Sequence, residues 1–494
     1  MIEFILNDQD IATDQSPGMT VLDFVRYHKD LKGTKIGCRE GDCGACTVLV
    51  GELVGQEIKY RTMTSCLMPL ANAAGNHIVT VEGINPDDGS LTPVQQAMVD
   101  TNGTQCGFCT VGFVMSLTGF CVDNTVKTPE MAVSSVDGNI CRCTGYKSIE
   151  RAAVCISEQL AASSKQSELP TISDGLTLAI AKQIVPKYFS DINGRLANLI
   201  TTALKAETRP VESVSSHRAF VGGGTDIYVQ RPDTIVDEPV SHLFYGEQLR
   251  GIRDTGTHIE IGASATVTDL LVSPVMQSVF PQLYKHLKLV SSTPIRNMAT
   301  LAGNFVNASP IGDMTVWFLA LDATIDLCCR SPHVSKGATR TMPLKDLYLG
   351  YKQLAKSRDE YITLIRFRKP TVDFRFNFEK VSKRTYLDIS TVNTAISLTS
   401  SPPYKGGVAA ASADGVVLSE VHVAAGGIAP IPLYLKETSA FLNGKAVSAA
   451  TVAQANEIMQ SEVSPISDVR GTEQYKRLLL RQLFRAHFVE LFEI

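Results

Sequence analysis

Three cysteines near the N-terminus lie on a glycine-rich loop, and a fourth follows from a separate segment. Residues 37–46 read GCREGDCGAC, and Cys66 comes after two strand-like stretches. Cysteines at C-x4-C-x2-C spacing with a remote fourth are the thiolate ligands of plant-type [2Fe-2S] clusters. Glycines at positions 37, 41 and 44 allow a tight loop that aims N–H groups at sulfur. The spacing therefore predicts an iron–sulfur centre with the ligands Cys38, Cys43, Cys46 and Cys66.

A second group of four cysteines follows, made of Cys106, Cys109, Cys141 and Cys143. A four-cysteine zinc site is the alternative for the first group, but zinc usually takes its thiolates as two short C-x2-4-C knuckles, which that motif lacks. For the second group, C-x2-C with C-x-C suits zinc or a redox pair as well as a cluster. Both of its pairs precede predicted helices, whose positive ends would face a negatively charged cluster.

The other four cysteines fit no ligand pattern. Cys121 and Cys155 stand at helical spacing among apolar residues, so we expect both to be buried packing residues. Cys328 and Cys329 end an apolar strand, and packing is again the expected role. The single tryptophan, Trp317, lies in an apolar run and is expected in a core.

Length and composition bound the class of protein. A chain of 494 residues with 44% hydrophobic residues predicts several domains with cores of their own. A net charge of −4 without a basic run gives no reason to expect nucleic acid or a membrane as partner. No stretch reaches the length of a membrane span, and the first residues lack the basic start of a signal peptide. We expect a soluble cytoplasmic protein, in which clustered thiols bind metal more often than they form disulfides.

Periodicity and breaker residues divide the chain into five segments, which predict a multidomain α+β protein. Residues 1–83 indicate a β-rich domain with one helix, capped by Thr20 and running to Gly33, and residues 84–160 indicate four helices. Residues 161–190 are polar and rich in breakers, which is typical of a linker. An α/β region spans 191–372, and a smaller α+β domain spans 373–494.

The α/β region holds two candidate ligand loops. The first consists of Phe220, Val221, Gly222, Gly223, Gly224, Thr225, Asp226 and Ile227. Three glycines free to adopt positive φ can form a nest of N–H donors for phosphate, although a tight turn without a ligand also explains a glycine triplet. The pattern is not G-x-G-x-x-G, so no Rossmann domain is expected. The second loop consists of Thr300, Leu301, Ala302, Gly303 and Asn304, followed by Asp313.

Together these motifs resemble the iron–sulfur and flavin subunit of bacterial xanthine dehydrogenases, in the molybdenum hydroxylase family. The resemblance covers nearly the whole chain and is most specific at the cysteine motifs, including GNICRCTGY at residues 138–146. It implies a β-grasp ferredoxin-like domain, a four-helix [2Fe-2S] domain, a two-part FAD-binding domain and a C-terminal flavoprotein domain. Both glycine loops and Asp313 would contact FAD, and Lys380 would lie close to the flavin. Segment 348–352 resembles the family's nicotinamide-side segment, although Lys352 replaces a common arginine and Ala302 replaces a common glycine.

The resemblance implies electron transfer rather than substrate chemistry, so no catalytic residue is expected on this chain. Electrons from a molybdenum-pterin cofactor on a large partner subunit would pass through two [2Fe-2S] clusters to FAD and then to NAD+, while hypoxanthine and xanthine are oxidised to urate. A flavin is needed between one-electron clusters and a hydride acceptor. A dimer of heterodimers is expected. The same relay could serve an aldehyde or another azaheterocycle hydroxylase, a hydroxybenzoyl-CoA reductase type, or a stand-alone NADH-oxidising reductase.

Overall fold

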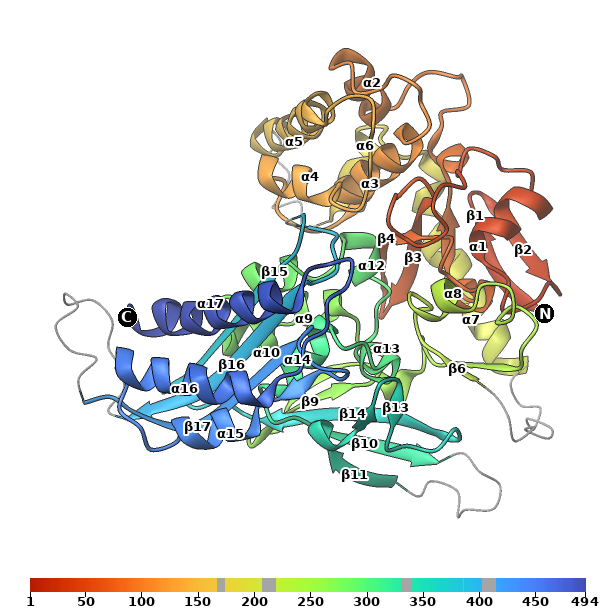
Figure 1. Cartoon of the computed structure of the whole chain (residues 1–494). Helices are drawn as coiled ribbons and strands as arrows, with labels where there is room; N and C mark the ends of the chain where they lie inside the picture. The colour runs from red at the N-terminus through yellow and green to blue at the C-terminus, as the bar shows by residue number, and fades with distance from the viewer. Residues whose placement is uncertain (167–173, 207–218, 330–338, 385, 402–414) are drawn as a thin grey trace. The chain divides into compact units, whose positions relative to one another are not determined.

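The computed structural model describes residues 1–166, 174–206, 219–329, 339–384, 386–401 and 415–494 (Figure 1). It divides into two units. The first consists of Met1–His242 with Ser292–Ala299, and the second consists of Leu243–Ser291 with Thr300–Ile494. A short segment within the second half of the chain therefore belongs to the first unit. No helix in the described residues is long and apolar enough to cross a membrane.

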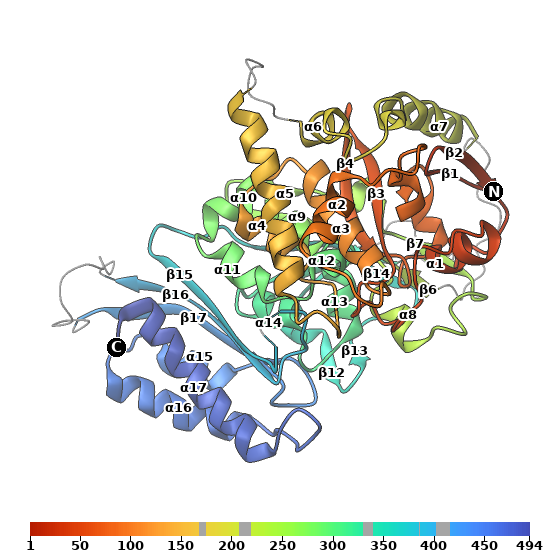
Figure 2. The same ribbon diagram turned by 90° about the horizontal axis from the view of Figure 1, so that it is seen from above.

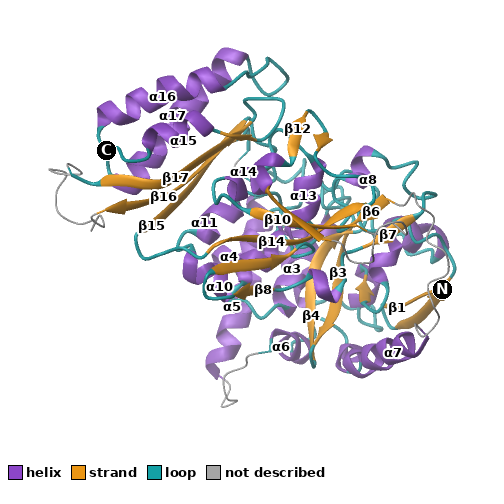
Figure 3. Cartoon of the chain, turned by 90° about the horizontal axis from the view of Figure 1, so that it is seen from below, coloured by secondary structure: helices purple, strands orange, loops and turns teal. Residues whose placement is uncertain are grey.

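The first unit begins with a five-stranded sheet of order β2-β1-β5-β3-β4. Its strands are β1 (Ile2–Leu6), β2 (Gln9–Thr13), β3 (Thr47–Val54), β4 (Glu57–Thr64) and β5 (His77–Val79). β1 pairs in parallel with β5 and antiparallel with β2, whereas β3 is antiparallel to both β4 and β5. This mixed sheet confirms the predicted β-grasp domain (Figure 3).

The helix of this domain is shorter than predicted. The Asp23 N–H donates to Thr20 Oγ1 at 3.1 Å, which confirms the predicted cap. However, α1 covers only Val21–Asp23, and a π-helical turn covers Phe24–His28. Asp30 adopts a positive φ of 57°, a conformation that cannot continue a right-handed helix, so the chain turns away before Gly33.

The four predicted helices of the second domain are present as α2 (Pro93–Asp100), α3 (Thr110–Val122), α4 (Pro129–Ser135) and α5 (Lys147–Gln166). Thr92 and Thr128 cap α2 and α4 with a proline at the first helical position. Every residue of α3 from Gly112 to Val122 is buried, so this helix forms the centre of the domain. Cys121 is fully buried there, as predicted, whereas Cys155 on α5 is only half-buried.

Residues 161–190, predicted as a linker from their composition, are largely helical where the structure describes them. α5 continues to Gln166, and the segment also holds α6 (Gly175–Ala181) and a 3-10 turn at Lys187–Ser190. Ala179, Ile184 and Phe189 are buried in the same hydrophobic core as α3. In the sequence, polar residues lie between these apolar residues, so the composition of the segment is like that of a linker. α7 (Ile192–Ala206) follows, and its Ile192 and Leu196 pack against Ile5 of β1.

The second unit contains an antiparallel sheet of order β11-β10-β14-β9-β8. Its strands are β8 (Ile252–Asp254), β9 (His258–Gly262), β10 (Thr324–Cys329), β11 (Thr339–Pro343) and β14 (Glu360–Arg368). The helices are α9 (Val267–Val272), α10 (Pro274–Val279), α11 (Leu283–Lys288), α13 (Leu301–Asn307) and α14 (Asp313–Leu319). Trp317 on α14 is fully buried, which confirms its predicted place in a core. Cys328 and Cys329 are half-buried at the end of β10.

The C-terminal part is a second α+β layer, as predicted. Its sheet has the order β15-β16-β17-β18, formed by Phe374–Val381, Val392–Ser401, Val417–Gly426 and Leu433–Tyr434. α15 (Lys436–Leu442), α16 (Ala449–Glu462) and α17 (Glu473–Phe492) lie along one face of this sheet (Figure 2). Leu480, Phe484 and Phe488 of α17 are buried in a core shared with Ile396 and Val423 of the strands.

Candidate cofactor sites

The first cysteine group lies where the loop at residues 37–46 meets the ends of β3 and β4. Cys46 directly precedes β3 and Cys66 follows β4, and the Ser65 hydroxyl donates to the Cys46 carbonyl at 2.7 Å. The Cys38 sulfur accepts backbone N–H bonds from Glu40 at 3.3 Å and from Cys43 at 3.4 Å. The structure therefore brings the predicted loop thiols and backbone donors together.

The four thiols of this group form two hydrogen-bonded pairs. Within each pair, the pKa of one thiol is lowered and the pKa of the other is raised. A hydrogen bond with Cys43 lowers the pKa of Cys38 to about 5, and the same bond raises the pKa of Cys43. A hydrogen bond with Cys66 likewise lowers the pKa of Cys46 and raises that of Cys66. Among the described residues no three His, Cys, Asp or Glu side chains surround a single ion position. Two thiol pairs with N–H donors to sulfur fit a two-iron cluster, in which each iron takes two protein ligands.

Some glycines of this loop adopt a positive φ, and at others a neighbouring atom leaves no room for a side chain. Gly41 and Gly44 adopt φ values of 79° and 67°, in the left-handed region that favours glycine. A Cβ on Gly44 would also lie 2.3 Å from the Gly138 carbonyl oxygen. At Gly37 a Cβ would lie 2.6 Å from the Cys43 sulfur, so a side chain there would displace a candidate ligand.

The second cysteine group lies at two helix starts, as predicted. Cys109 is the N-cap of α3, and Cys143 precedes α5. The sulfurs of Cys106 and Cys143 are 3.7 Å apart, and the Thr144 hydroxyl donates to the Cys141 sulfur at 3.2 Å. Burial and a hydrogen bond with Cys141 raise the pKa of Cys109 to about 12. These four thiols also form two pairs, one buried or half-buried and one exposed.

One backbone hydrogen bond and one side-chain hydrogen bond join the two cysteine motifs. The Ile140 N–H donates to the Cys43 carbonyl at 3.0 Å, and Asn139 Nδ2 donates to the Gly44 carbonyl at 3.2 Å. The Ser116 hydroxyl donates to Asn139 Oδ1 at 2.7 Å, which fixes the amide from α3. Sequence reasoning missed Asn139 as a functional candidate. In the sequence, the only feature that could have indicated Asn139 is its position two residues before the candidate ligand Cys141.

The glycine triplet follows β6 (Ala219–Val221), which pairs in parallel with β7 (Val240–His242), and precedes α8 (Ile227–Gln230). The prediction of three positive-φ glycines is wrong for two of them, because only Gly224 adopts such a value, at 89°. Gly223 has another role: a Cβ there would lie 1.8 Å from the Met298 carbonyl oxygen. Asn72 Nδ2 donates to the Gly222 carbonyl at 3.1 Å. The main chain of Met298 therefore leaves no room for a side chain at Gly223.

The second predicted loop belongs to the second unit and forms the start of α13. The Gly303 N–H donates to Thr300 Oγ1 at 3.1 Å, which caps the helix. Asn304 Oδ1 accepts bonds from both the backbone N–H and the hydroxyl of Thr315, each at 3.0 Å. Leu301 is buried, and Ala302 is half-buried. The first loop, from Phe220 to Ile227, lies in the first unit.

Lys380 and Asp313, both predicted to lie at the flavin, are brought together. Lys380 Nζ on β15 donates to Asp313 Oδ2 at 2.7 Å and to the Leu289 carbonyl at 2.8 Å. The other carboxylate oxygen accepts bonds from the Ser390 hydroxyl at 2.6 Å and from Asn393 Nδ2. Sequence reasoning missed Ser390 and Asn393, because polar residues beside a buried strand carry no distinctive pattern.

Segment 348–352 forms a hairpin of β12 (Tyr348–Gly350) and β13 (Gln353–Leu354). Leu349 and Tyr351 on this hairpin are 68% and 64% exposed. Lys352 Nζ donates to Asn307 Oδ1 at 2.8 Å, so this lysine fastens the hairpin to the end of α13.

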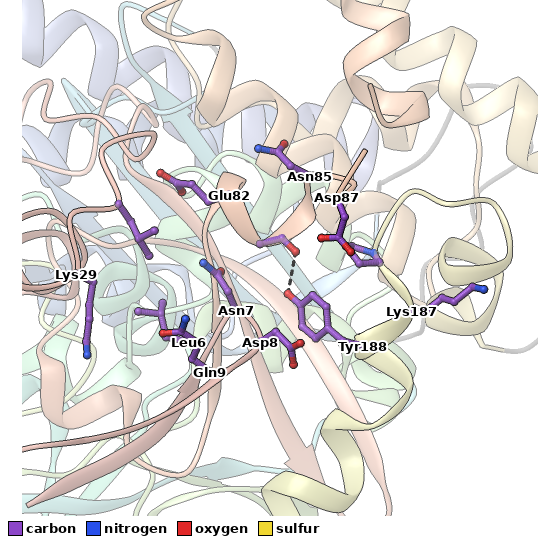
Figure 4. Close-up of a pocket in the computed structure, with 13 residues that line it drawn as sticks. Leu6, Asn7, Asp8, Gln9, Lys29, Glu82, Asn85, Asp87, Lys187 and Tyr188 are labelled. Atoms are coloured by element: carbon purple, nitrogen blue, oxygen red, sulfur yellow. Dashed lines mark hydrogen bonds between the residues drawn. The ribbon is translucent and has the colours of Figure 1, made fainter. Parts of the chain in front are cut away.

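A cavity of about 420 Å³ opens on the ferredoxin-like domain, but it contains none of the predicted site residues (Figure 4). Tyr188 lines it, and the Tyr188 hydroxyl donates to the Gly83 carbonyl at 2.8 Å. The neighbouring lining residues include Asn7, Asp8, Glu82 and Lys187. The cavity thus marks where residues 186–188 pack on the first domain, and it has no assigned ligand.

Models of four protein families match the chain in succession. They are described as a 2Fe-2S iron-sulfur cluster binding domain (residues 4–71), a [2Fe-2S] binding domain (80–154), an FAD binding domain in molybdopterin dehydrogenase (200–369) and a CO dehydrogenase flavoprotein C-terminal domain (378–491). The chain is therefore an iron–sulfur flavoprotein with two [2Fe-2S] domains and one FAD-binding domain. The order of these four domains matches the layout of the iron–sulfur and flavin part of the molybdenum hydroxylases, which are oxidoreductases.

Curated proteins with similar sequences include xanthine dehydrogenases. The chain is 29% identical to a xanthine dehydrogenase of Emericella nidulans over 90% of its own length and 35% of the relative's length. It is 26% identical to xanthine dehydrogenase 1 of Arabidopsis thaliana over 96% of its own length and 38% of the relative's. The chain thus spans little more than a third of these proteins.

Solved structures with a similar fold include a carbon monoxide dehydrogenase chain from Hydrogenophaga pseudoflava. It is 24% identical, covers 60% of this chain and 94% of its own, and has a TM-score of 0.49. A chain of quinoline 2-oxidoreductase from Pseudomonas putida 86 is 20% identical, covers 55% of this chain and 88% of its own, and has a TM-score of 0.47. Neither similarity bears on the substrate.

Proposed function

We propose that this chain is the electron-transfer subunit of a xanthine dehydrogenase. Its two [2Fe-2S] domains and FAD would carry electrons from a molybdenum-cofactor subunit to NAD+ while hypoxanthine and xanthine are oxidised to urate. The names of the curated relatives support this substrate, and the four-domain layout supports the relay. The chain spans little more than a third of the length of these relatives, and in our proposal the molybdenum cofactor is bound outside the residues of this chain.

The observation that carries the proposal is the arrangement of eight cysteines as two sets of two thiol pairs. The first set would be Cys38, Cys43, Cys46 and Cys66, and the second would be Cys106, Cys109, Cys141 and Cys143. Hydrogen bonds between paired thiols leave Cys38 and Cys46 ready to lose a proton, and iron binds the thiolate form. Backbone N–H groups at the Cys38 sulfur would then stabilise the reduced state.

FAD would be held by the two glycine loops, with Asp313 and Lys380 beside the flavin. When bound, FAD can accept single electrons and deliver a hydride, which clusters alone cannot do. In the first loop, residues 220–227, the main chain of Met298 leaves no room for a side chain at Gly223, and N–H groups of the loop would bind the pyrophosphate. In the second, Thr300 to Asn304, the helix cap at Thr300 fixes the backbone. The buried ammonium of Lys380, anchored by Asp313, would stabilise negative charge on the flavin.

The helical domain would receive electrons from the partner. Cys106 and Cys143 are exposed, and Phe108 beside them is 47% exposed, so one edge of this candidate site faces outward. Arg142 and Lys147 flank that edge and are exposed as well. These features support a docking surface for a molybdopterin-binding subunit on the helical domain, and a dimer of heterodimers would fit this scheme.

The test separates the relay from its substrate. The isolated chain, loaded with clusters and FAD, should oxidise NADH with an artificial acceptor but leave xanthine untouched. Mixing it with the proposed molybdenum-cofactor subunit should restore xanthine-dependent reduction of NAD+, and Arg142→Glu should slow that reaction while sparing NADH oxidation. Lys59→Glu on β4, in the other cluster domain, is the control. Turnover of an aldehyde or another heterocycle instead of xanthine would reject the substrate, and xanthine turnover by the isolated chain would reject the division of labour.

A further inference from the structure

A short segment of the FAD-binding region is built into the iron–sulfur unit. Residues Ser292–Ala299 group with the first unit, although the chain before and after them belongs to the second. The segment includes α12 (Thr293–Arg296) and lies within the matched FAD-binding region. Its contacts with the two cluster domains can therefore be described within one unit.

This segment binds Asp137 of the helical domain through a buried ion pair. Arg296 Nη2 donates to Asp137 Oδ2 at 2.7 Å, and both side chains are only 3% exposed. The Thr293 N–H donates to the other carboxylate oxygen at 2.8 Å, and Arg296 also donates to Thr293 Oγ1 at 2.7 Å. A Cβ on Gly138 would lie 2.7 Å from Pro294 Cδ, so the segment sits directly against the chain that leads to Cys141.

On the ferredoxin-like domain, the same segment holds the end of β4 and the cysteine loop. Asn297 Nδ2 donates to the Thr62 carbonyl at 2.8 Å, four residues before Cys66. A Cβ on Gly41 would lie 2.7 Å from Ile295 Cδ1, so the isoleucine fills the space above the loop between Cys38 and Cys43. The segment therefore touches structural supports of both candidate cluster sites.

We propose that Arg296 is a positioning residue that fixes the spacing of the two clusters through Asp137. This inference rests on the proposed function. Its physical basis is that a buried carboxylate must keep its cation, and Arg296 is the cation that the structure supplies. Because Arg296, Ile295 and Asn297 are consecutive, a shift of the arginine would move the contacts at Gly41 and Thr62 as well.

The experiment uses the full chain with its clusters and FAD. Arg296→Gln is compared with Arg296→Lys, Asp137→Asn and a matched control, Arg195→Gln, which breaks a more exposed ion pair with Asp8 in the same unit. Pulsed EPR measures the dipolar interaction between the two reduced clusters, and rapid mixing with NADH measures electron transfer from flavin into them. Arg296→Gln should change the dipolar spectrum and slow transfer between clusters by about tenfold, because a small displacement of positioned groups lowers the rate of the step between them. Arg296→Lys should recover part of both, and Arg195→Gln should change neither.

An unchanged dipolar spectrum and rate in Arg296→Gln, with both cluster signals present, would overturn the proposal while leaving the relay intact. If Arg296→Gln does not fold, Asp137→Asn and Arg296→Lys retain hydrogen-bonding groups, and wild-type readouts in both would also overturn it. Absence of two cluster signals from the wild-type chain would instead refute the relay, and the positioning role with it.

Discussion

Lys380 and Asp313 form an ion pair in the second unit, with Nζ and Oδ2 2.7 Å apart and side chains only 1% and 13% exposed. Sixty-seven residues separate them in the sequence. The lysine also donates to the Leu289 carbonyl, and the carboxylate accepts bonds from Ser390 and Asn393. Each of the two charged groups is therefore held by more than one hydrogen bond, and both belong to the residues proposed to lie at FAD.

Lys380→Met should weaken FAD retention and make the flavin midpoint potential more negative. The variant leaves Asp313 buried without its cation, a change that typically costs 3–5 kcal/mol, so about that loss of stability is expected locally. A reduced, anionic flavin would also lose a neighbouring positive charge. FAD-to-protein ratio and a redox titration measure both effects. Lys369→Met, at a half-exposed pair with Asp254, is the control, and equal FAD content and potential in the two variants would contradict the proposed role.

Gly223→Val should abolish FAD retention while both clusters remain. A Cβ at this position would lie 1.8 Å from the Met298 carbonyl oxygen, so the loop must shift away from its present course. Flavin absorbance per iron after gel filtration is the readout. Gly194→Ala, on α7 with nothing within 4 Å of the added Cβ, is the matched control. Stoichiometric FAD in Gly223→Val would show that the triplet is only a turn.

Acidification should destabilise the second unit through its buried histidines. Burial lowers the pKa of His487 to about 3 and that of His286 to about 4, below the ordinary value of 6.5. Because the folded pKa values are depressed, the unfolded chain binds more protons below pH 6.5, and stability falls as the pH drops from there toward 4. Each such histidine contributes a slope of about 1.4 kcal/mol per pH unit.

His487→Gln should therefore flatten the acid dependence of unfolding by about one proton, measured by urea denaturation between pH 6.5 and 4.5. The glutamine can retain hydrogen bonds to Asn377 and Thr394, the present partners of the ring nitrogens. His258→Gln, at an exposed position on β9, should leave the slope unchanged. An identical slope in wild type and His487→Gln would show that acid acts elsewhere.

The sequence alone predicted the features that depend on local spacing. The cysteine motifs and the cap at Thr20 each follow from a few neighbouring residues. The wrong or incomplete predictions depend on distant contacts. Gly223 is required by the backbone of Met298, and α6 and the turn at Lys187–Ser190 pack into a core whose other apolar residues lie far away in the sequence. Neither contact leaves a trace in the local pattern.

The polar supports of the candidate sites were also invisible in the sequence. Asn139, Ser390 and Asn393 became candidates only when the structure placed each beside a cysteine motif or beside Asp313. Single polar residues in apolar surroundings are common, and only their hydrogen-bond partners distinguish them.

The most direct test of the central claim is EPR spectroscopy with metal analysis on the anaerobically purified chain. The two-cluster account predicts about four irons and four acid-labile sulfides per FAD, because eight thiolates hold two two-iron centres. Reduced samples should show two distinct signals, of which Cys43→Ser removes one and Cys141→Ser the other. Cys121→Ser, at a buried cysteine outside both groups, should keep both. Stoichiometric zinc with no EPR signal from freshly prepared protein would contradict the account.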